Sequence, residues 1–320
     1  MYQPLTAGIE LGGTKCVALV ARGQEVLALT RVATTSPTLT LTALSDWLQS
    51  RYVEMPFVAL GIASFGPLGL NPLQPNYGFI TRTPKAGWEN TDIIGAFSSW
   101  FSGPIGFDTD VNGSALAEGL WGGSEGCSTY VYLTIGTGVG GGLVIDGTPA
   151  HGLVHPEMGH VRVRRVAGDH FAGACPFHGN CLEGLVSGPA LASRTGTKGE
   201  ALEPNHPVWR NVAEEIAELL ATIILVVSPE RILIGGGVGM GQSLMFPLIR
   251  DAVGHRLQGY VAEIDGEALD RLIIQPALGN HAGPLGAIAL GLRALGSLGS
   301  RDGRSGREVA RPSPRMKRNR

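Results

Sequence analysis

Three glycine-rich turns constrain the fold of this chain more than any other feature. They read LGGTK (11–15), GTGVGGG (136–142) and GGGVGMG (235–241), and each follows a short apolar run. Glycine makes up 48 of the 320 residues, about twice its usual share, and follows no collagen-like period. A turn without side chains lets the backbone approach another group closely. We therefore expect buried strands that end at turns able to meet a ligand.

The order of the apolar runs predicts an α/β protein. In the first part of the chain we expect strands at 7–11, 16–23, 25–34 and 57–66, a helix at 40–53, and a strand, loop and helix within 104–122. A strand–glycine hairpin–strand unit should follow at 130–147 and a long helix at 208–227. The chain should end with a strand and helix start within 229–241, a last strand at 272–283 and a final helix at 284–295. The unit at 130–147 repeats the design of the N-terminal strands. This repetition predicts two related lobes with a cleft between them.

The first turn, LGGTK, combines features that suit phosphate. Gly12 and Gly13 remove side chains where a strand ends, so main-chain N–H groups can point at an anion. Thr14 adds a hydroxyl and Lys15 adds a positive charge. Taken alone, the stretch could equally be a hairpin turn without a ligand. Three such turns in one chain favour a nucleotide.

Polar side chains also gather where a predicted strand meets a predicted helix, in FDTDVNG. A phosphoryl acceptor needs a base beside its hydroxyl, and a carboxylate such as that of Asp108 or Asp110 can serve. The alternative is that Asp110 or Asn112 only caps the helix. The spacing by itself favours the cap.

The stretch CPFHGNCLE has the ligand spacing of a metal site. Cys175, His178 and Cys181 follow a C-x2-H-x2-C pattern, which lets one loop wrap a tetrahedral zinc ion. Such an ion needs a fourth ligand, and both His160 and His170 are near enough in the sequence to provide it. The alternatives are a disulfide and two inert buried thiols.

The expected compartment favours a metal over a disulfide. The N-terminus lacks a basic segment followed by an apolar stretch, so no signal peptide is expected. The most apolar run, at 216–227, is too short to span a bilayer. The chain is therefore expected in the cytoplasm, where thiols stay reduced. Cys16 and Cys127 have no metal-ligating neighbours and are expected to be small core residues.

The C-terminal stretch 297–320 differs from the rest of the chain. It holds eight basic and two acidic residues and almost no apolar ones. Such a composition predicts a solvated, disordered tail. The alternative is a segment that contacts nucleic acid or an acidic partner.

Taken in order, the motifs GIELGGTK, DTDVNGSALAEG, LTIGTGVGGGLVIDG, HPEMGH, CLEG and ILIGGGVG resemble those of the ROK family of sugar kinases, which also includes repressors. The resemblance covers residues 7–293. It implies an α/β protein with the actin-like ATPase (ribonuclease H-like) fold, two lobes and a nucleotide cleft. The implied limits are 1–118 for the N-terminal lobe, 119–282 for the C-terminal lobe with the zinc loop, 283–296 for a final helix that returns to the N-terminal lobe, and 297–320 for the disordered basic tail.

The resemblance also implies roles for individual residues. Asp110 is expected to be the catalytic base that takes the proton from the sugar hydroxyl as it attacks the γ-phosphate of ATP. The sugar-binding residues are expected to be Thr109, Glu157, His160 and Glu183. The ATP-binding residues are expected to be Glu10, Gly12, Gly13, Thr14, Lys15, Thr137, Gly138, Pro189, Gly235, Gly236, Gly237, Val238 and Gly239, with Mg²⁺ accompanying ATP. The structural zinc ligands are expected to be His160, Cys175, His178 and Cys181.

Within the family, the stretches GIASFGPLGL, NYGFITRTPKAGW and CPFHGNCLEGLVSGPA resemble the bacterial fructokinase group. That likeness implies phosphorylation of D-fructose at O6, and a homodimer. Glu10 stands where most of the family has Asp, although the fructokinase group resembles this chain there. Thr109 stands where many members have Asn. A kinase for glucose, mannose or N-acetylmannosamine is the alternative.

Two functions without catalysis compete with a kinase. A repressor of the same family needs an N-terminal helix-turn-helix, and the first predicted strand begins near residue 7, so no DNA-binding domain is expected. A sugar-responsive binding or regulatory protein would be expected to lack the catalytic base. Asp110 is present, which favours the enzyme.

Overall fold

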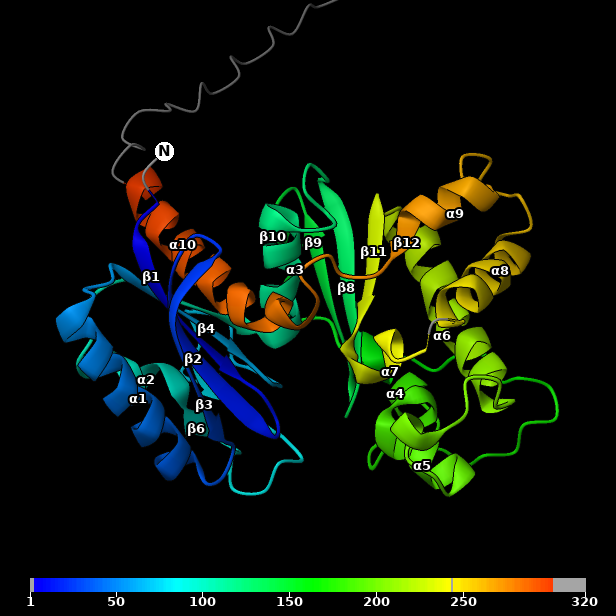
Figure 1. The fold of residues 1–320 in the computed structure, drawn as a ribbon, viewed down its shortest axis with the longest axis horizontal. Helices are drawn as coiled ribbons and strands as arrows, with labels where there is room; N and C mark the ends of the chain where they lie inside the picture. The colour runs from blue at the N-terminus through cyan, green and yellow to red at the C-terminus, as the bar shows by residue number, and fades with distance from the viewer. Residues whose placement is uncertain (1–2, 243, 302–320) are drawn as a thin grey trace, which may run out of the picture.

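The computed structural model describes residues 3–242 and 244–301 and contains two five-stranded sheets (Figure 1). The first sheet has the spatial order β3 (Glu25–Ala33), β2 (Lys15–Arg22), β1 (Leu5–Leu11), β4 (Ala59–Ser64) and β7 (Ile105–Thr109). The second has the order β10 (Thr148–Pro149), β9 (Val139–Ile145), β8 (Thr129–Ile135), β11 (Arg231–Gly235) and β12 (Ile273–Ile274). A small separate sheet pairs β5 (Phe79–Ile80) with β6 (Thr91–Asp92).

Both large sheets follow the same plan. The first strand of each forms an antiparallel hairpin with the next strand, β1 with β2 and β8 with β9. The same strand pairs in parallel with a later one, β1 with β4 and β8 with β11. The hairpins close between Leu11 and Cys16 and between Ile135 and Val139. The predicted α/β fold with two related lobes is confirmed.

Two helices lie between the sheets (Figure 1). α10 (Ala282–Arg301) packs on β1, β4 and β7 of the first sheet, and α3 (Asp110–Trp121) packs on β8 and β9 of the second. The helices contact each other at two glycines, because a Cβ atom on Gly286 would lie 2.4 Å from the main-chain carbonyl carbon of Gly113. The absence of side chains at this crossing lets the two backbones touch.

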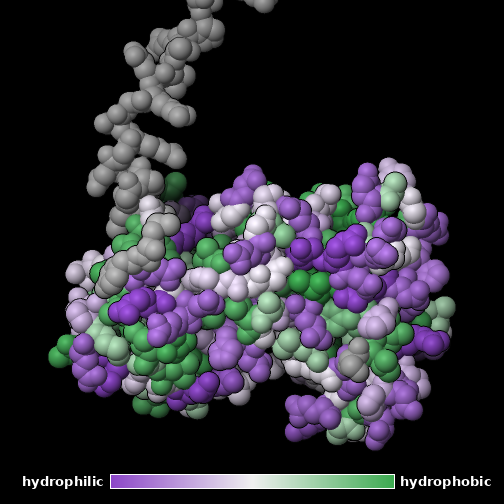
Figure 2. All heavy atoms as spheres, turned by 45° about the horizontal axis from the view of Figure 1, so that its top comes forward, coloured by the Kyte–Doolittle hydropathy of each residue, from purple (hydrophilic) through white to green (hydrophobic). Residues whose placement is uncertain are grey.

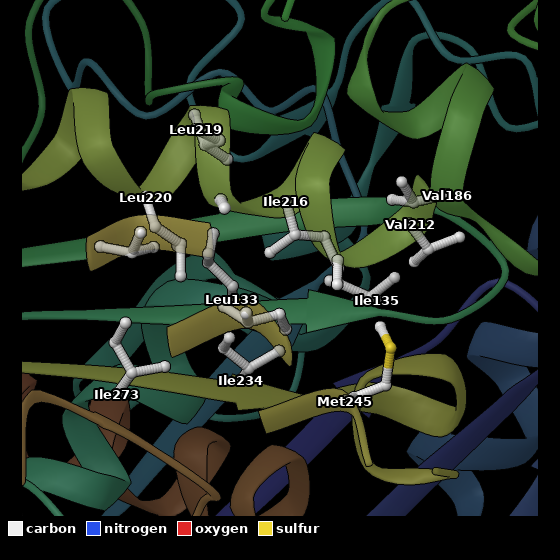
Figure 3. Packing of buried hydrophobic residues seen from close by; sticks show 14 of the residues in the cluster. Leu133, Ile135, Val186, Val212, Ile216, Leu219, Leu220, Ile234, Met245 and Ile273 are labelled. Carbon is white, nitrogen blue, oxygen red and sulfur yellow. The ribbon is translucent and has the colours of Figure 1, made fainter. Parts of the chain in front are cut away.

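Further helices surround the two sheets (Figure 1). The first lobe carries α1 (Pro37–Glu54) and α2 (Ile93–Ser98), and the second carries α4 (Leu182–Val186), α5 (Gly188–Thr195), α6 (Val208–Val227), α7 (Gly236–Met240), α8 (Met245–Leu257) and α9 (Gly266–Leu272). Short 3-10 turns occur at η1 (Met158–His160), η2 (Gly199–Ala201) and η3 (Gly279–His281). The core of the second lobe joins β8, β11, α6 and α8 through Leu133, Ile234, Ile216 and Met245 (Figure 3).

The surface of the molecule is mixed in character. Figure 2 shows hydrophilic and hydrophobic residues side by side on one face. Within the described residues, no helix has the length and apolar character that crossing a membrane requires.

Two local expectations were wrong. No loop separates β7 from α3, because the helix begins at Asp110, directly after the last strand residue Thr109. The strand expected at 272–283 is reduced to β12. Pro276 has no N–H group to extend a strand ladder, and the chain there turns towards α10.

The C-terminal expectations are tested only in part. α10 continues to Arg301, so residues 297–301 belong to a helix rather than to a disordered tail. Once a helix has formed, adding residues to its end costs little. Residues 302–320 lie outside the described residues. The lobe limits stay a prediction, and the expected limit at 118 falls within α3, which contacts both sheets.

Candidate active site

Two cavities in the cleft between the lobes meet at the start of α3. The smaller has a volume of about 420 Å³ and the larger about 870 Å³. Asp110, Val111 and Thr134 line both cavities. Of these three shared residues, which are all that the described part of the chain contributes to both cavities, Asp110 is the acidic one. Asp110 can therefore be approached from both cavities.

The local structure explains how Asp110 is held. Thr109 is the N-cap of α3, because its hydroxyl oxygen accepts the N–H of Asn112 at 3.1 Å. The expected alternative, in which Asp110 or Asn112 caps the helix, is therefore wrong. Asp110 is the first helical residue, and its Oδ1 accepts the N–H of Val111 at 2.9 Å. The second carboxylate oxygen of Asp110 accepts no hydrogen bond among the described residues.

Electrostatics favour a proton-accepting role for Asp110 near neutral pH. Burial is the main reason that the pKa of Asp110 is raised to about 7, and the carboxylates of Glu10 and Glu157 raise it further. The N–H of Val111 acts in the opposite direction. A carboxylate whose pKa is close to the working pH can accept a proton from a substrate and can release that proton again at the same pH.

The other polar residues of the FDTDVNG motif have a structural role. Asp108 Oδ1 accepts hydrogen bonds from the side chain of Asn112 and from the N–H of Thr109, both at 2.7 Å. His151 Nε2 lies 3.0 Å from Asp108 Oδ2, and this contact raises the pKa of His151. Asp108 lines neither of the two cavities. The structure thus separates Asp110 from the second candidate base.

The first glycine turn is fixed through its carbonyl groups. The Thr34 hydroxyl donates to Gly12 O at 2.7 Å, and Lys85 Nζ donates to Gly13 O at 2.6 Å. A Cβ atom on Gly12 would lie 2.5 Å from Lys15 O, so the turn needs glycine at this position. Because the carbonyl groups of Gly12 and Gly13 accept these hydrogen bonds from the protein itself, the conformation of the turn is fixed before a ligand binds.

The smaller cavity contains both signs of charge. Glu10 and Lys15 line it, together with Arg31 from β3. Burial raises the pKa of Glu10, while Lys15 and Arg31 act to lower it. The opposite wall contains Gly236 and Asn280. Two carboxylates, those of Glu10 and Asp110, share this cavity and repel each other, which is a setting that suits a divalent cation.

The larger cavity collects the predicted sugar-binding residues. Thr109, Glu157, His160 and Glu183 all line it. Glu183 Oε2 accepts the N–H of Val139 at 3.0 Å, so the second glycine hairpin holds this carboxylate. The cavity is also lined by Gly13 and Thr14 of the first glycine turn and by Thr137 and Gly138 of the second.

The remaining predicted ATP-binding residues lie outside the lining of these two cavities. They are Gly12, Pro189, Gly235, Gly237, Val238 and Gly239. In the third turn, Gly236 has a φ of +83°, and a Cβ atom there would lie 2.4 Å from Ile135 O. The third turn therefore packs directly against the end of β8, beside the second turn.

Four side chains form a compact cluster at one end of the larger cavity. The Nδ1 atom of His160 lies 3.8 Å from Cys175 Sγ, 3.5 Å from Cys181 Sγ and 3.3 Å from His178 Nδ1. All four ligand atoms lie within 4.8 Å of one another. Ligand atoms bound to one tetrahedral zinc ion are about 3.3–3.8 Å apart, given the usual bond lengths. His170 is not in the cluster.

The cluster connects directly to the larger cavity. His160 turns Nδ1 towards the two thiols and lines the cavity as well, so its Nε2 atom remains for a second contact. Cys181 is the N-cap of α4, and Glu183 follows it in the first turn of that helix. Burial raises the pKa of the Cys181 thiol to about 11. A bound cation would favour the thiolate instead.

Sequence reasoning missed several residues that the fold brings to the site. Arg31 reaches the smaller cavity because it pairs with Val17 across β2 and β3. Lys85 comes from a loop of the first lobe and lines the larger cavity. His155 Nε2 accepts the N–H of Leu68 at 3.1 Å, a contact between the lobes. His155 and Lys85 lie within the quoted HPEMGH and NYGFITRTPKAGW motifs, but neither residue was assigned a role, and Arg31 belongs to no local pattern.

The two lobes each contain a strand–glycine hairpin–strand unit, and the carboxylate of Asp110 lines both cavities of the cleft between them. This arrangement defines a class of protein, the sugar kinases of the actin-like ATPase fold. The chain belongs to the ROK family, whose sequence model matches residues 6–294. Among known proteins, it is 44% identical to a fructokinase of Zymomonas mobilis over 89% of this chain and 96% of that protein. It is 39% identical to a fructokinase of Pediococcus pentosaceus over 91% of this chain and 99% of that protein.

Solved structures agree with this family. A ROK hexokinase from Thermus thermophilus has a TM-score of 0.77 and 25% identity, with 92% of this chain and 99% of that chain covered. A ROK glucokinase from Streptomyces griseus, in complex with glucose and AMPPNP, has a TM-score of 0.70 and 25% identity, covering 90% and 99%. The predicted family and fold are confirmed.

Proposed function

We propose that this protein is an ATP-dependent fructokinase that transfers the γ-phosphate of ATP to O6 of D-fructose, with Asp110 as the general base. The observation that carries the proposal is the position of Asp110 in the wall shared by the two cavities. A base so placed can take the proton from a hydroxyl in one cavity while that hydroxyl attacks a phosphate that enters from the other. The identity to two curated fructokinases supports fructose as the substrate.

ATP is proposed to occupy the smaller cavity and to extend its phosphates towards the first glycine turn. Lys15 and Arg31 supply positive charge for the phosphates, and the main chain at Gly13 and Thr14 supplies N–H donors. Mg²⁺ bound with ATP neutralises the charge that develops on the transferred group. Glu10 fits such an ion because its half-buried side chain lines the same cavity as Asp110 and has no hydrogen bond among the described residues.

The sugar is proposed to occupy the larger cavity. Glu157 and Glu183 accept hydrogen bonds from its hydroxyl groups, and His160 contacts it through Nε2. The fixed hydrogen bond from Val139 to Glu183 reduces the reorganisation that binding requires. Thr109 contributes its position in the cavity wall rather than its hydroxyl oxygen, which already caps α3.

The four-residue cluster is proposed to hold a structural zinc ion, with His160, Cys175, His178 and Cys181 as ligands. The separations around His160 Nδ1 support tetrahedral coordination. The ion would join η1 to the start of α4. Since Glu157 directly precedes η1 and Glu183 lies in α4, the ion would fix the distance between two sugar-binding carboxylates.

A coupled assay of ADP release tests the substrate. Fructose, glucose, mannose and N-acetylmannosamine are measured side by side with Mg²⁺ and ATP. We expect fructose to have the highest kcat/KM, because a site that bonds hydroxyl groups discriminates when one partner is missing. Glucose or mannose exceeding fructose about tenfold would leave a hexose kinase and reject the fructokinase. The expected homodimer, the cytoplasmic location and the lobe limits stay predictions.

A further inference from the structure

A buried carboxylate joins the two segments that connect the lobes. Residues 122–128, here called the first crossing, lead from α3 to β8 of the second sheet. Residues 275–281, the second crossing, lead from β12 back to α10. Glu118, in the last turns of α3, has an exposed fraction of 0% and lies where the two crossings meet.

Both oxygens of Glu118 accept hydrogen bonds from the main chain of these crossings. Oε2 accepts the N–H of Gly123 at 2.7 Å and the N–H of Ala277 at 3.1 Å. Oε1 accepts the N–H of Leu278 at 2.9 Å. One side chain therefore holds the first crossing against the second, although Gly123 and Ala277 are more than 150 residues apart in the sequence.

The chemistry of this contact makes it a strong one. None of the ion pairs found among the described residues includes Glu118, and its two carboxylate oxygens accept their hydrogen bonds from main-chain N–H groups. Hydrogen bonds to an ionised acceptor are roughly twice as strong as neutral ones. Loss of the carboxylate would leave the donors at Gly123, Ala277 and Leu278 without partners. Gly122 leaves room for the group, because a Cβ atom there would lie 2.1 Å from Glu118 Oε2.

The hydrogen bonds of Glu118 connect to the candidate active site through two segments, α3 and the second crossing. α3 begins with Asp110, eight residues before Glu118, or about 12 Å along the helix. The second crossing continues into Gly279 and Asn280, which line the smaller cavity. Glu118 thus fixes the position of these cavity-lining residues, on the side where ATP is proposed to bind, relative to α3, which carries Asp110.

We propose that Glu118 is a positioning residue, which sets the distance between the Asp110 carboxylate and the ATP bound in the smaller cavity by clamping the two crossings together. The proposal rests on the function proposed above for the smaller cavity. It assigns Glu118 no contact with ATP or sugar. A small displacement of reacting groups lowers turnover strongly, so the clamp matters for the chemical step.

The first test is hydrogen exchange in the unaltered protein. Ala277 is exposed and lies in an irregular turn, where an amide without a partner exchanges quickly. If Glu118 accepts its hydrogen, peptides that cover 275–281 should show slowly exchanging amides at Ala277 and Leu278. Fast exchange of both amides in the unaltered protein would overturn the clamp.

The second test compares Glu118→Gln with a matched control. The amide keeps the shape but places an NH₂ group against main-chain donors, so exchange at Ala277 and Leu278 should rise at least about tenfold. We expect kcat to fall about 10- to 100-fold and KM for ATP to rise, with KM for the sugar unchanged. Glu230→Gln is the control, because Glu230 Oε1 also accepts two main-chain N–H groups, those of Ser128 at the end of the first crossing and of Thr129 in β8, but none from the second crossing among the described residues.

The outcomes separate this proposal from the fructokinase proposal. Faster exchange in Glu118→Gln with unchanged kcat and unchanged KM for ATP overturns the positioning role. A kinetic loss as large in Glu230→Gln overturns it too, because the effect would then not depend on the link between the two crossings. If the unaltered protein phosphorylates no sugar, the fructokinase proposal fails alone. Exchange and the affinity for a non-hydrolysable ATP analogue, which should be weaker in Glu118→Gln, still test the clamp.

Discussion

His160 Nδ1 lies 3.5 Å from Cys181 Sγ, although the two residues belong to different segments on either side of a long loop. The contact brings η1 and α4 together at the larger cavity. Two acidic residues of that cavity are adjacent to this contact, Glu157 directly before η1 and Glu183 in the first turn of α4. The geometry of the larger cavity therefore depends on the cluster beside it.

Removal of the metal tests that dependence. We expect one zinc ion per chain by elemental analysis, and Cys181→Ser should lose it because a hydroxyl is a poor zinc ligand. Loosening α4 should raise KM for the sugar more than KM for ATP. His170→Ala is the control and should keep the ion, since His170 lies outside the cluster. A Cys181→Ser protein with full zinc content and unchanged sugar KM would contradict the proposed cage.

Replacement of the proposed base tests the chemistry. Asp110→Asn is nearly isosteric and keeps an acceptor for the N–H of Val111, so the fold and ATP binding should persist. Without a base, kcat should fall by roughly 10²–10⁴. Asp108→Asn is the matched control, because Asp108 lines neither cavity and its loss should lower stability more than turnover. Near-normal kcat in Asp110→Asn would reject the assignment.

The pH dependence of activity follows from the same residue. Asp110 must be ionised to accept a proton, and its pKa is raised to about 7. We therefore expect kcat/KM, which reports the free enzyme, to fall about tenfold for each pH unit below that value. The slope should disappear from the residual activity of Asp110→Asn. A kcat/KM that stays constant from pH 5 to 8 would contradict the raised pKa.

Stability should depend on pH in the opposite direction. A carboxyl group with a folded-state pKa above its ordinary value of 3.8 stabilises the fold while it is protonated. That contribution is lost as the pH rises towards 7, because ionisation then favours the unfolded chain. Asn cannot ionise, so the Tm of Asp110→Asn should exceed that of the unaltered protein by an amount that grows between pH 5 and 7. Thermal unfolding at several pH values measures this difference, and a constant difference would contradict it.

Lys85 provides a further test of the first glycine turn. Its ammonium group donates to Gly13 O at 2.6 Å and adds positive charge to the larger cavity beside Asp110. Lys85→Met should keep the fold, since the side chain is only half-buried, but lower kcat/KM for ATP about tenfold. Lys198→Met, at an exposed position far along the chain, is the control. Equal effects of the two changes would show that Lys85 has no special role.

Much of the fold was predictable because its signals are local. Each glycine turn follows an apolar strand, so the LGGTK and GTGVGGG stretches indicated the two hairpins directly. The start of α3 was harder, because Asp110, Asn112 and Thr109 are all suitable caps. Only the backbone geometry shows that the Thr109 hydroxyl accepts the N–H of Asn112.

Long-range contacts explain what the sequence could not indicate. Arg31 faces the smaller cavity only because β3 pairs with β2 in one register. Glu118 looks like an ordinary helical residue, yet it meets Ala277 and Leu278 from the far end of the chain. His170 is nearer to the cysteines in sequence than His160, yet among the described residues the folded loop brings only His160 into the cluster.

The glycine contact between α3 and α10 has a mechanical consequence. Gly113 and Gly286 present bare backbone to each other, so the helices can tilt there without unlocking interdigitated side chains. Glu118 holds the same helix at a second place. Two fixed points define an axis, and a body hinged on one axis retains a single rotation. We therefore expect any opening of the cleft to be a rotation about the line through these two contacts, in which every atom of a lobe follows a circular arc.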